Sequence, residues 1–421
     1  MNSLDKNIIL FIDSCFEEEL YQTGLEILDV VFMPNNDNCD FMPFLPERYL
    51  LILINLILLK DDTSHISQKA AQLLYRIVCS KKLSKNELYD QWSWMFCHQV
   101  RARKLGKFID TTDIDDLNLQ NNSQLNSIES IFSKFSNVWR LIQYCFEEPS
   151  TALYILLNCI VSILELDYQE YSKESEKELE KLLFISSLKN NDREKPNIKQ
   201  ALAAIFANID LEKYEYPLSF PSIMKTSIEG NVMKSIESMM LRKRLLFLTY
   251  NVIYSLPKNI NQFDFENELS IYLKKMEINK FIFYLSNVIP SPLRSNLCHM
   301  LLVKYSVHSK LSRHFLELST DMLKLWPSIA SQVRLGLLEK AKYSFLLQTL
   351  LRSIFNDILL KKITQGEQQA MQLAKTKRIA GFNDEFEKIK QNNKITSEYL
   401  YIKDVFEQSE YIISIILEQI S

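Results

Sequence analysis

Cysteine and histidine, the side chains best suited to nucleophilic or metal chemistry, are few and scattered along this chain of 421 residues. Two adjacent pairs, Cys97-His98 and Cys298-His299, bring both ligand types together. Neighbours on a helix point about 100° apart, and neither pair has a CxxC or HxxxH partner nearby. We therefore predict no metal site and no catalytic residue.

The remaining cysteines and histidines fit ordinary structural roles. A nucleophilic mechanism would need a histidine beside a cysteine or serine, and the spacing does not indicate one. Cysteines within apolar helical segments behave as small hydrophobic residues, so we expect reduced, buried thiols of the cytosol or nucleus, and solvated or core histidines. The cysteines are Cys15, Cys39, Cys79, Cys97, Cys145, Cys159 and Cys298, and the histidines are His65, His98, His299, His308 and His314.

Glycine-rich phosphate cradles are absent from the sequence. No two of the six glycines lie within ten residues of each other. Both the Walker and the dinucleotide-binding fingerprints need clustered glycine, because the backbone must approach a phosphate closely. We expect no cofactor and no enzymatic activity.

Basic side chains form three clusters with two interpretations. They could form a nucleic-acid groove or docking sites for an acidic peptide, or they could be solvated helix faces and helix C-terminal cations. The net charge of −3 argues against a protein held mainly on phosphates. The first cluster precedes an acidic loop (Asp110, Asp113, Asp115, Asp116), which favours the solvated interpretation there. The clusters are Arg101, Arg103, Lys104 and Lys107; Arg242-Lys243-Arg244; and Lys375, Lys377 and Arg378.

Trp92, Trp94 and Trp139 lie in two aromatic segments, QWSWMF and NVWRLIQYCF. Exposed tryptophans would supply anchors for a partner protein. Trp92 and Phe96, however, are four residues apart and so share one helix face, as core residues do. We favour core packing for each of them.

Composition indicates that helices position all of these residues. The chain is 47% hydrophobic and 24% charged, which suits a soluble protein with a large core. It has only six glycines and eleven prolines, about a third of their usual combined share of roughly 12%. Apolar residues recur with helical period. The predicted helices are 5–31, 46–60, 66–81, 85–105, 124–147, 150–168, 172–189, 196–208, 225–255, 263–276, 278–288, 292–307, 310–325, 328–363 (broken), 366–379, 383–391 and 397–420.

Two apolar stretches invite a comparison with membrane spans. Tyr49–Leu59 has 11 residues, and Thr151–Leu166 has 16. Both are shorter than the roughly 20 residues that a transmembrane helix needs, so we predict helices buried on nearly all sides. The N-terminal apolar run Ile8–Ile12 is too short for a signal peptide, so we expect no secretion.

Paired helices of this length are typical of HEAT or armadillo solenoids, at about 40 to 47 residues per unit. We therefore predict an all-α, HEAT/armadillo-like α-solenoid of antiparallel helix pairs; a compact bundle is the alternative. Surface-to-volume scaling limits a single core to about 250 to 300 residues, which favours an extended stack or two packed halves. We expect N-terminal helical repeats in 1–107, a polar loop in 108–127, and central and C-terminal repeats in 128–421, with the whole chain forming either two blocks or one continuous solenoid.

Three segments resemble a known family. They are FMPFLP at 41–46 leading into YLLILINLILL, AAQLLYRI at 70–77, and WRLIQYCF at 139–146. The resemblance is to the fungal Tel-Two-interacting protein Two family, the smallest subunit of the TTT co-chaperone complex. It covers about a quarter of the chain, and the length and helical layout agree across the rest.

The resemblance implies a non-enzymatic scaffold in the cytoplasm and nucleus. Its implied partners are larger helical-repeat subunits and the ninety-kilodalton heat-shock chaperone machinery. Its implied clients are phosphatidylinositol-3-kinase-related kinases, which act in TOR signalling, the DNA damage response and telomere maintenance. The family pattern transfers no site residue. The alternatives are a helical-repeat scaffold of another nuclear or trafficking assembly, and a nucleic-acid-binding solenoid.

Overall fold

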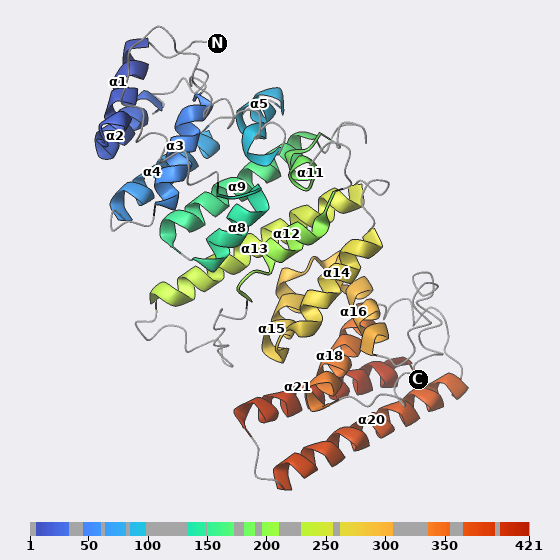
Figure 1. The fold of residues 1–421 in the computed structure, drawn as a ribbon. Coiled ribbons are helices and arrows are strands. Elements are labelled where there is room, and N and C mark those ends of the chain that lie inside the picture. The colour runs from blue at the N-terminus through green and yellow to red at the C-terminus, as the bar shows by residue number, and fades with distance from the viewer. Residues whose placement is uncertain are drawn as a thin grey trace. The chain divides into compact units, whose positions relative to one another are not determined.

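The structure, a computed structural model, describes residues 6–32, 45–59, 64–80, 85–97, 134–148, 150–171, 181–189, 196–209, 229–255, 262–305, 336–353, 365–391 and 396–420. Every regular element in these ranges is helical, which confirms the predicted all-α class (Figure 1). The elements are α1 (Lys6–Glu17), α2 (Tyr21–Phe32), α3 (Glu47–Leu58), α4 (Ser64–Ser80), α5 (Lys85–Phe96), α8 (Val138–Glu147), α9 (Thr151–Tyr171), α11 (Leu183–Ser187), α12 (Ile198–Ile205), α13 (Glu229–Ser255), α14 (Gln262–Lys275), α15 (Ile278–Phe283), the π-helical turn η4 (Tyr284–Val288), α16 (Ser291–Tyr305), α18 (Leu337–Ser353), α20 (Gln365–Gln391) and α21 (Ser397–Ile420).

Helix packing divides the chain into two compact units, unit 1 (Met1–Asn261) and unit 2 (Gln262–Ser421). The predicted polar loop at 108–127 lies outside the described residues. The predicted separation of repeats 1–107 from repeats 128–421 therefore stays a prediction, and so does the solenoid arrangement of the helices.

The core of unit 1 is built around α3 and α9. Every residue of α3 from Tyr49 to Leu58 is buried, as expected for a helix without a polar face. α9 lies between α4 and α13 and also contacts α3, α5, α8 and α11. The prediction that both apolar stretches are helices within the core is confirmed.

The helix that contains the second apolar stretch is longer than the stretch itself. α9 has 21 residues and runs on to Tyr171, so length and composition alone would let it cross a membrane. Buried core helices can have the same length and composition. In α9, 61% of the apolar window is buried within the protein. Packing against helices on several sides accounts for its composition.

The chain breaks between α1 and α2, where a single helix over 5–31 was predicted. Glu19 has a φ of 60°, in the left-handed region, and the Leu20 N–H donates to the carbonyl of Cys15 over 2.8 Å. This geometry ends an α-helix by satisfying its last carbonyls, and it usually has glycine at the left-handed position. No glycine or proline marks the break, so the helical pattern appeared continuous.

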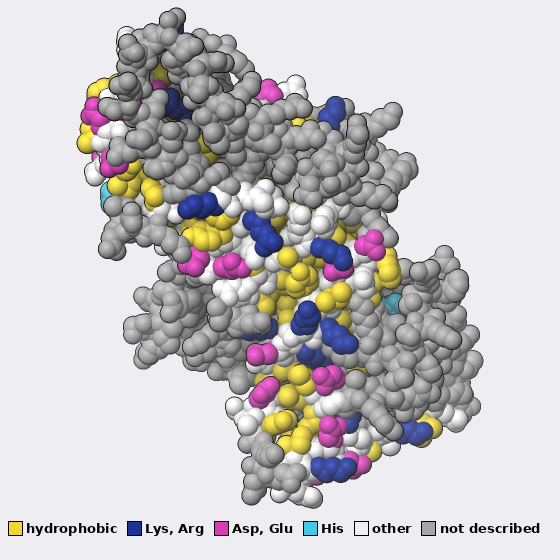
Figure 2. All heavy atoms as spheres, viewed as in Figure 1, with side chains coloured by type: hydrophobic (Ala, Val, Ile, Leu, Met, Phe, Trp, Pro, Cys, Tyr) yellow, Lys and Arg dark blue, Asp and Glu magenta, His cyan; other side chains and the backbone are white. Residues whose placement is uncertain are grey.

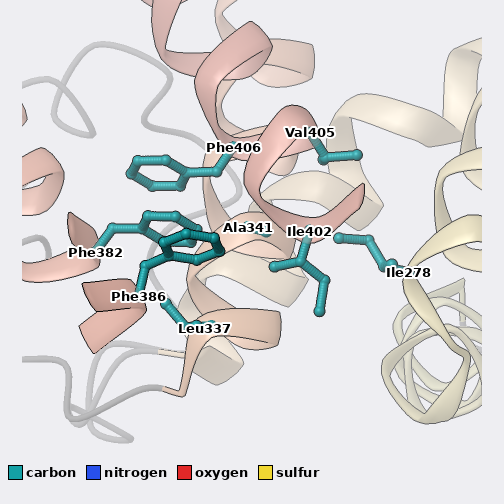
Figure 3. Close-up of a cluster of buried hydrophobic side chains, with 8 residues drawn as sticks. All are labelled: Ile278, Leu337, Ala341, Phe382, Phe386, Ile402, Val405 and Phe406. Atoms are coloured by element: carbon teal, nitrogen blue, oxygen red, sulfur yellow. The ribbon is translucent and has the colours of Figure 1, made fainter. Parts of the chain in front are cut away.

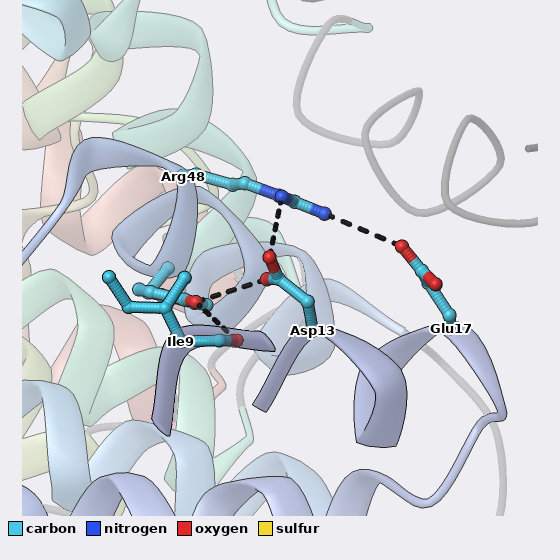
Figure 4. A network of polar contacts seen from close by, with 5 residues as sticks. Ile9, Asp13, Glu17 and Arg48 are labelled. Atoms are coloured by element: carbon cyan, nitrogen blue, oxygen red, sulfur yellow. Dashed lines mark hydrogen bonds and ion pairs between the residues drawn. The ribbon is translucent and has the colours of Figure 1, made fainter. Parts of the chain in front are cut away.

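A polar network fastens α1 to α3 (Figure 4). The Arg48 guanidinium lies 3.1 Å from Asp13 Oδ2 and 4.0 Å from Glu17 Oε1. The Tyr49 hydroxyl lies 3.0 Å from Asp13 Oδ1 and 3.4 Å from the Ile9 carbonyl. Burial and the neighbouring Asp13 carboxylate raise the pKa of the Tyr49 phenol, which therefore stays a neutral donor.

Other helices in unit 1 differ from their predicted bounds where the structure describes them. α5 ends at Phe96, and residues 98–105 of the predicted helix lie outside the described residues. The predicted helix 172–189 is helical only as the short α11 among its described residues. α8 begins at Val138, because the Asn137 side chain accepts a hydrogen bond from the Arg140 N–H and caps the helix. Residues 134–137 are therefore not helical as predicted, and residues 124–133 lie outside the described part of the chain. A side chain that bonds to the backbone can end a helix where the apolar pattern continues. The apolar pattern alone therefore does not show where the helix begins.

Unit 2 packs α18 between α16 and α21. A cluster of buried hydrophobic side chains joins α18, α20 and α21 to α15 (Figure 3). The rings of Phe382 and Phe406 stack with centroids 3.8 Å apart, and Phe386 lies on the other side of Phe382. The cluster consists of Ile278, Leu337, Ala341, Phe382, Phe386, Ile402, Val405 and Phe406.

α20 is one helix of 27 residues where two, 366–379 and 383–391, were predicted. Residues 366–381 are helical throughout, so the interpretation of this segment as a helix holds and that of a flexible connector does not. Gly381 lies inside the helix, where a Cβ atom would meet no atom within 4 Å. The predicted helix 310–325 lies outside the described residues.

Alanine substitutions at Gly381 and Gly24 are expected to act in opposite directions. Gly381→Ala should stabilise the protein by about 0.5–1 kcal/mol, because alanine loses less backbone entropy in a helix. Gly24→Ala should destabilise it, because the new Cβ would lie 3.0 Å from the buried Phe16 ring and overpacking costs about 1–3 kcal/mol. Urea denaturation of the two variants checks this, and a stabilising Gly24→Ala would contradict the packing described for α1 and α2.

Candidate interaction surfaces

Most cysteines are buried and unreactive. Among the described residues Cys15, Cys97, Cys145, Cys159 and Cys298 are buried free thiols, Cys79 is exposed, and Cys39 lies outside those residues. Burial raises the pKa of Cys298 to about 12 and raises the pKa of Cys145 and Cys159 further, so these thiols stay protonated. The predicted buried, reduced thiols are confirmed at these five positions, and the prediction of burial is wrong at Cys79.

No group of three or more metal-ligating side chains comes together within the ranges that the structure describes. Cys298 and His299 are neighbours on α16, and His98 of the other adjacent pair lies outside those ranges. His65 is exposed on α4, while His308 and His314 also lie outside the described part of the chain.

Acidification is expected to weaken the fold through His299. Burial disfavours the charged imidazolium and lowers the pKa of His299 from its ordinary value of about 6.5. The unfolded chain therefore binds more protons, so this contribution to stability is complete above about pH 6.5 and is lost as the pH falls through the folded pKa. In His299→Gln this contribution should be missing, so its stability should fall less than that of the wild type between about pH 7.5 and 5.

Urea denaturation at several pH values measures this difference. His65→Gln provides the control, since the His65 ring is exposed on α4. Identical pH profiles for the wild type and His299→Gln would contradict the prediction.

The second basic cluster is divided between core and surface. Arg242 is almost fully buried, and its guanidinium lies 3.9 Å from the centroid of the Phe146 ring. It donates to the carbonyls of Ile205 and Ala207, at the C-terminal end of α12. Arg242 therefore acts as a buried cap on a helix C-terminus, where a cation is favoured by the helix dipole.

The neighbouring Arg244 bridges two helices. It donates to Glu165, to Asn158 and to Ser162 Oγ at 3.1 Å, so that α13 is held to the outer face of α9. Within this cluster only Lys243 is exposed. Residues 242–244 therefore form neither a continuous basic groove nor a wholly solvated helix face. Both interpretations are wrong for this cluster.

The third cluster is divided in the same way. Arg378 is buried and paired with Glu410, while Lys377 is exposed and Lys375 is partly exposed. The first cluster, at 101–107, lies outside the described residues. Adjacent cations therefore do not make one surface at either described cluster, because successive helical residues face different directions.

The tryptophans belong to the core. Trp92, Trp94 and Trp139 are all buried, as predicted. Trp94 Nε1–H donates to the Gln91 carbonyl at 2.8 Å, and Trp139 Nε1–H donates to Ser187 Oγ at 3.0 Å. They are therefore not anchors for a partner protein.

Large apolar side chains do lie exposed elsewhere, on outward helix faces that the sequence interpretation did not single out. In unit 1, Phe11 of α1 is 59% exposed, Val30 of α2 is 72% exposed and Phe247 of α13 is 54% exposed. In unit 2, Tyr411 of α21 is 68% exposed. On the face shown in Figure 2, hydrophobic, basic and acidic side chains of the described residues are interspersed. Such mixed surfaces with exposed aromatic residues suit protein partners.

The fold, these surfaces and the buried cations define an all-helical protein with candidate protein-interaction faces. Comparisons of the chain with models of known families, with curated proteins and with solved structures find no match.

Proposed function

We propose that the protein is a non-enzymatic scaffold subunit of a TTT-like co-chaperone complex. Its helices would form a HEAT/armadillo-like α-solenoid that binds larger helical-repeat subunits. With the heat-shock chaperone machinery, the complex would support folding, assembly and stability of phosphatidylinositol-3-kinase-related kinases in the cytoplasm and nucleus. The three segments that resemble the Tel-Two-interacting protein Two family support this choice of complex.

The observation that supports a scaffold most directly is the exposure of large apolar side chains on well-packed helices. Phe247 projects from α13 beside the buried Leu246 and Leu248 of unit 1. Tyr411 projects from α21 near the buried Ile413 of unit 2. Exposed aromatic side chains of this kind are the residues that most often anchor a partner protein. Burial of such surfaces would stabilise both the scaffold and its partner.

The test is purification of the tagged full-length protein from its native cells at moderate salt, with bound proteins identified by mass spectrometry. We expect two larger helical-repeat subunits together with chaperone components and kinase-related clients. A protein that purifies alone as a stable monomer and binds no helical-repeat subunit would contradict the proposal.

The same experiment decides between the alternatives. Recovery of a different nuclear or trafficking assembly would support a scaffold outside the TTT family. Nucleic acid recovered at low salt and lost as salt rises would favour a nucleic-acid-binding solenoid, because phosphate contacts release counterions.

A further inference from the structure

A row of exposed side chains runs along the outward face of α21. Successive members are three or four residues apart, so they lie on one line along the helix. All seven are exposed, and three are apolar while three are acidic. We call this row the acidic ridge; it consists of Ser397, Leu400, Asp404, Glu407, Tyr411, Ile415 and Glu418.

The opposite face of α21 is fully used within unit 2. Ile402, Phe406 and Ile413 are buried, and α21 packs against α18 and α20. The apolar residues of the acidic ridge therefore do not belong to this core. Tyr411 and Leu400 are among the most exposed large hydrophobic residues in the described part of the chain.

The ridge carries three carboxylates and no cation. Lys403, on the flank of α21, lies 3.5 Å from Glu407, and its Nζ also lies 5.0 Å from the Phe386 ring centroid. Asp404 accepts a hydrogen bond from Gln408 at 2.9 Å, but no ion pair to Asp404 or Glu418 is found within the described residues. The ridge therefore has negative charge available to a partner.

We propose that the acidic ridge of α21 is the docking surface for a basic amphipathic helix of a partner protein. Apolar residues of that helix would pack against Leu400 near one end of the ridge and against Tyr411 and Ile415 near the other. Lysine or arginine residues beside them would reach Asp404 and Glu418. This inference rests on the proposed scaffold function, for which it names a binding face and the chemistry of the partner.

The negative charge of the acidic ridge disfavours other molecules that could cover it. Two copies of the chain joined ridge to ridge would bring their carboxylates together, which is unfavourable. An anionic nucleic acid or membrane surface would be repelled in the same way. A basic helix is the occupant whose charge complements the ridge.

A synthetic peptide tests this binding mode with the full-length protein. The probe is a fluorescent helix of about three heptads with leucine at positions a and d and lysine at e and g. The matched control peptide has glutamate in place of lysine. Fluorescence anisotropy should show binding of the basic peptide alone, and its affinity should fall with rising salt because salt screens exposed charges.

Variants then locate the binding to the ridge. Tyr411→Ala should weaken it by about tenfold or more, as for a central aromatic anchor. The double change Asp404→Asn and Glu418→Gln should weaken it and reduce its salt dependence. Leu373→Ala and Glu387→Gln, at exposed positions of α20, are the matched controls and should leave binding unchanged. Melting temperatures should stay near that of the wild type, because all these side chains are exposed.

The proposal is overturned if the wild type binds neither peptide or both equally, if Tyr411→Ala binds as the wild type does, or if the α20 controls lose as much affinity. It is also overturned if sedimentation shows a dimer of the wild type that Tyr411→Ala dissociates. Larger subunits that co-purify equally with the ridge variants would refute the ridge and leave the scaffold function standing. A peptide bound at the ridge with no helical-repeat subunit co-purifying would refute only the scaffold function.

Discussion

Replacing Glu410 by alanine is expected to destabilise unit 2 by about 3–5 kcal/mol, because it leaves the Arg378 guanidinium buried without its counter-charge. The two side chains are each 5% exposed, and Arg378 Nε lies 2.6 Å from Glu410 Oε1. A second hydrogen bond runs from the guanidinium to Glu410 Oε2 at 2.8 Å. The buried Ser344 hydroxyl also donates to Oε1 at 2.7 Å. This network joins α18, α20 and α21.

Removal of both charges should cost far less than removal of one. The double change Arg378→Met and Glu410→Leu keeps the apolar volume and leaves the Ser344 hydroxyl without its acceptor, a loss of about 1–3 kcal/mol. The control is Glu387→Ala, which breaks an exposed pair with Lys390 and should change stability by less than about 0.5 kcal/mol.

Urea denaturation followed by far-UV circular dichroism measures these changes. A Glu410→Ala variant as stable as Glu387→Ala would show that the pair is not buried as described. A double variant no more stable than Glu410→Ala would show that volume, not charge, dominates at this position.

Replacing Trp139 by alanine is expected to cost about 3–5 kcal/mol in unit 1. Its ring is buried and packs edge-on against Phe184, with centroids 5.4 Å apart. Its indole N–H donates to Ser187 Oγ, which in turn donates to the Phe184 carbonyl at 2.6 Å. The substitution therefore opens a cavity and removes a donor between α8 and α11.

Two further variants separate these effects. Trp139→Phe keeps most of the apolar volume, so it should cost less than Trp139→Ala. Phe247→Ala removes an exposed ring and should shift the melting temperature little. A Trp139→Ala protein with an unchanged melting temperature would show that Trp139 contacts solvent or a partner.

The basic clusters show how far a sequence can predict a surface. Helical period already implies that Arg242, Lys243 and Arg244 point in different directions, about 100° apart in turn. Only the packed structure shows that Arg242 reaches the end of α12 and that Arg244 reaches α9. Both partners lie more than 30 residues away along the chain. Long-range partners of this kind leave no local pattern.

Part of the acidic ridge could be predicted from the sequence. The range 397–420 was predicted as a helix with the bounds that the structure has, and the spacing of Leu400, Tyr411 and Ile415 places them on one side of it. The sequence alone did not decide whether that side faces the core or solvent, because both sides of α21 carry large apolar residues. Packing of Ile402, Phe406 and Ile413 against unit 2 decided it.

The sequence by itself determined the all-α class, because few glycines and prolines and a persistent helical period leave no other regular structure. It also determined that the apolar segments of α3 and α9 lie in the core. These helices are apolar on nearly all sides, and exposure of apolar surface to water is unfavourable. The break at the left-handed Glu19 rests on a local bond between Leu20 and Cys15, but no glycine or proline marks it in the sequence. Tertiary structure alone decided which cations are buried, as at Arg378, because its partner Glu410 is distant in sequence and only folding brings the two side chains into contact.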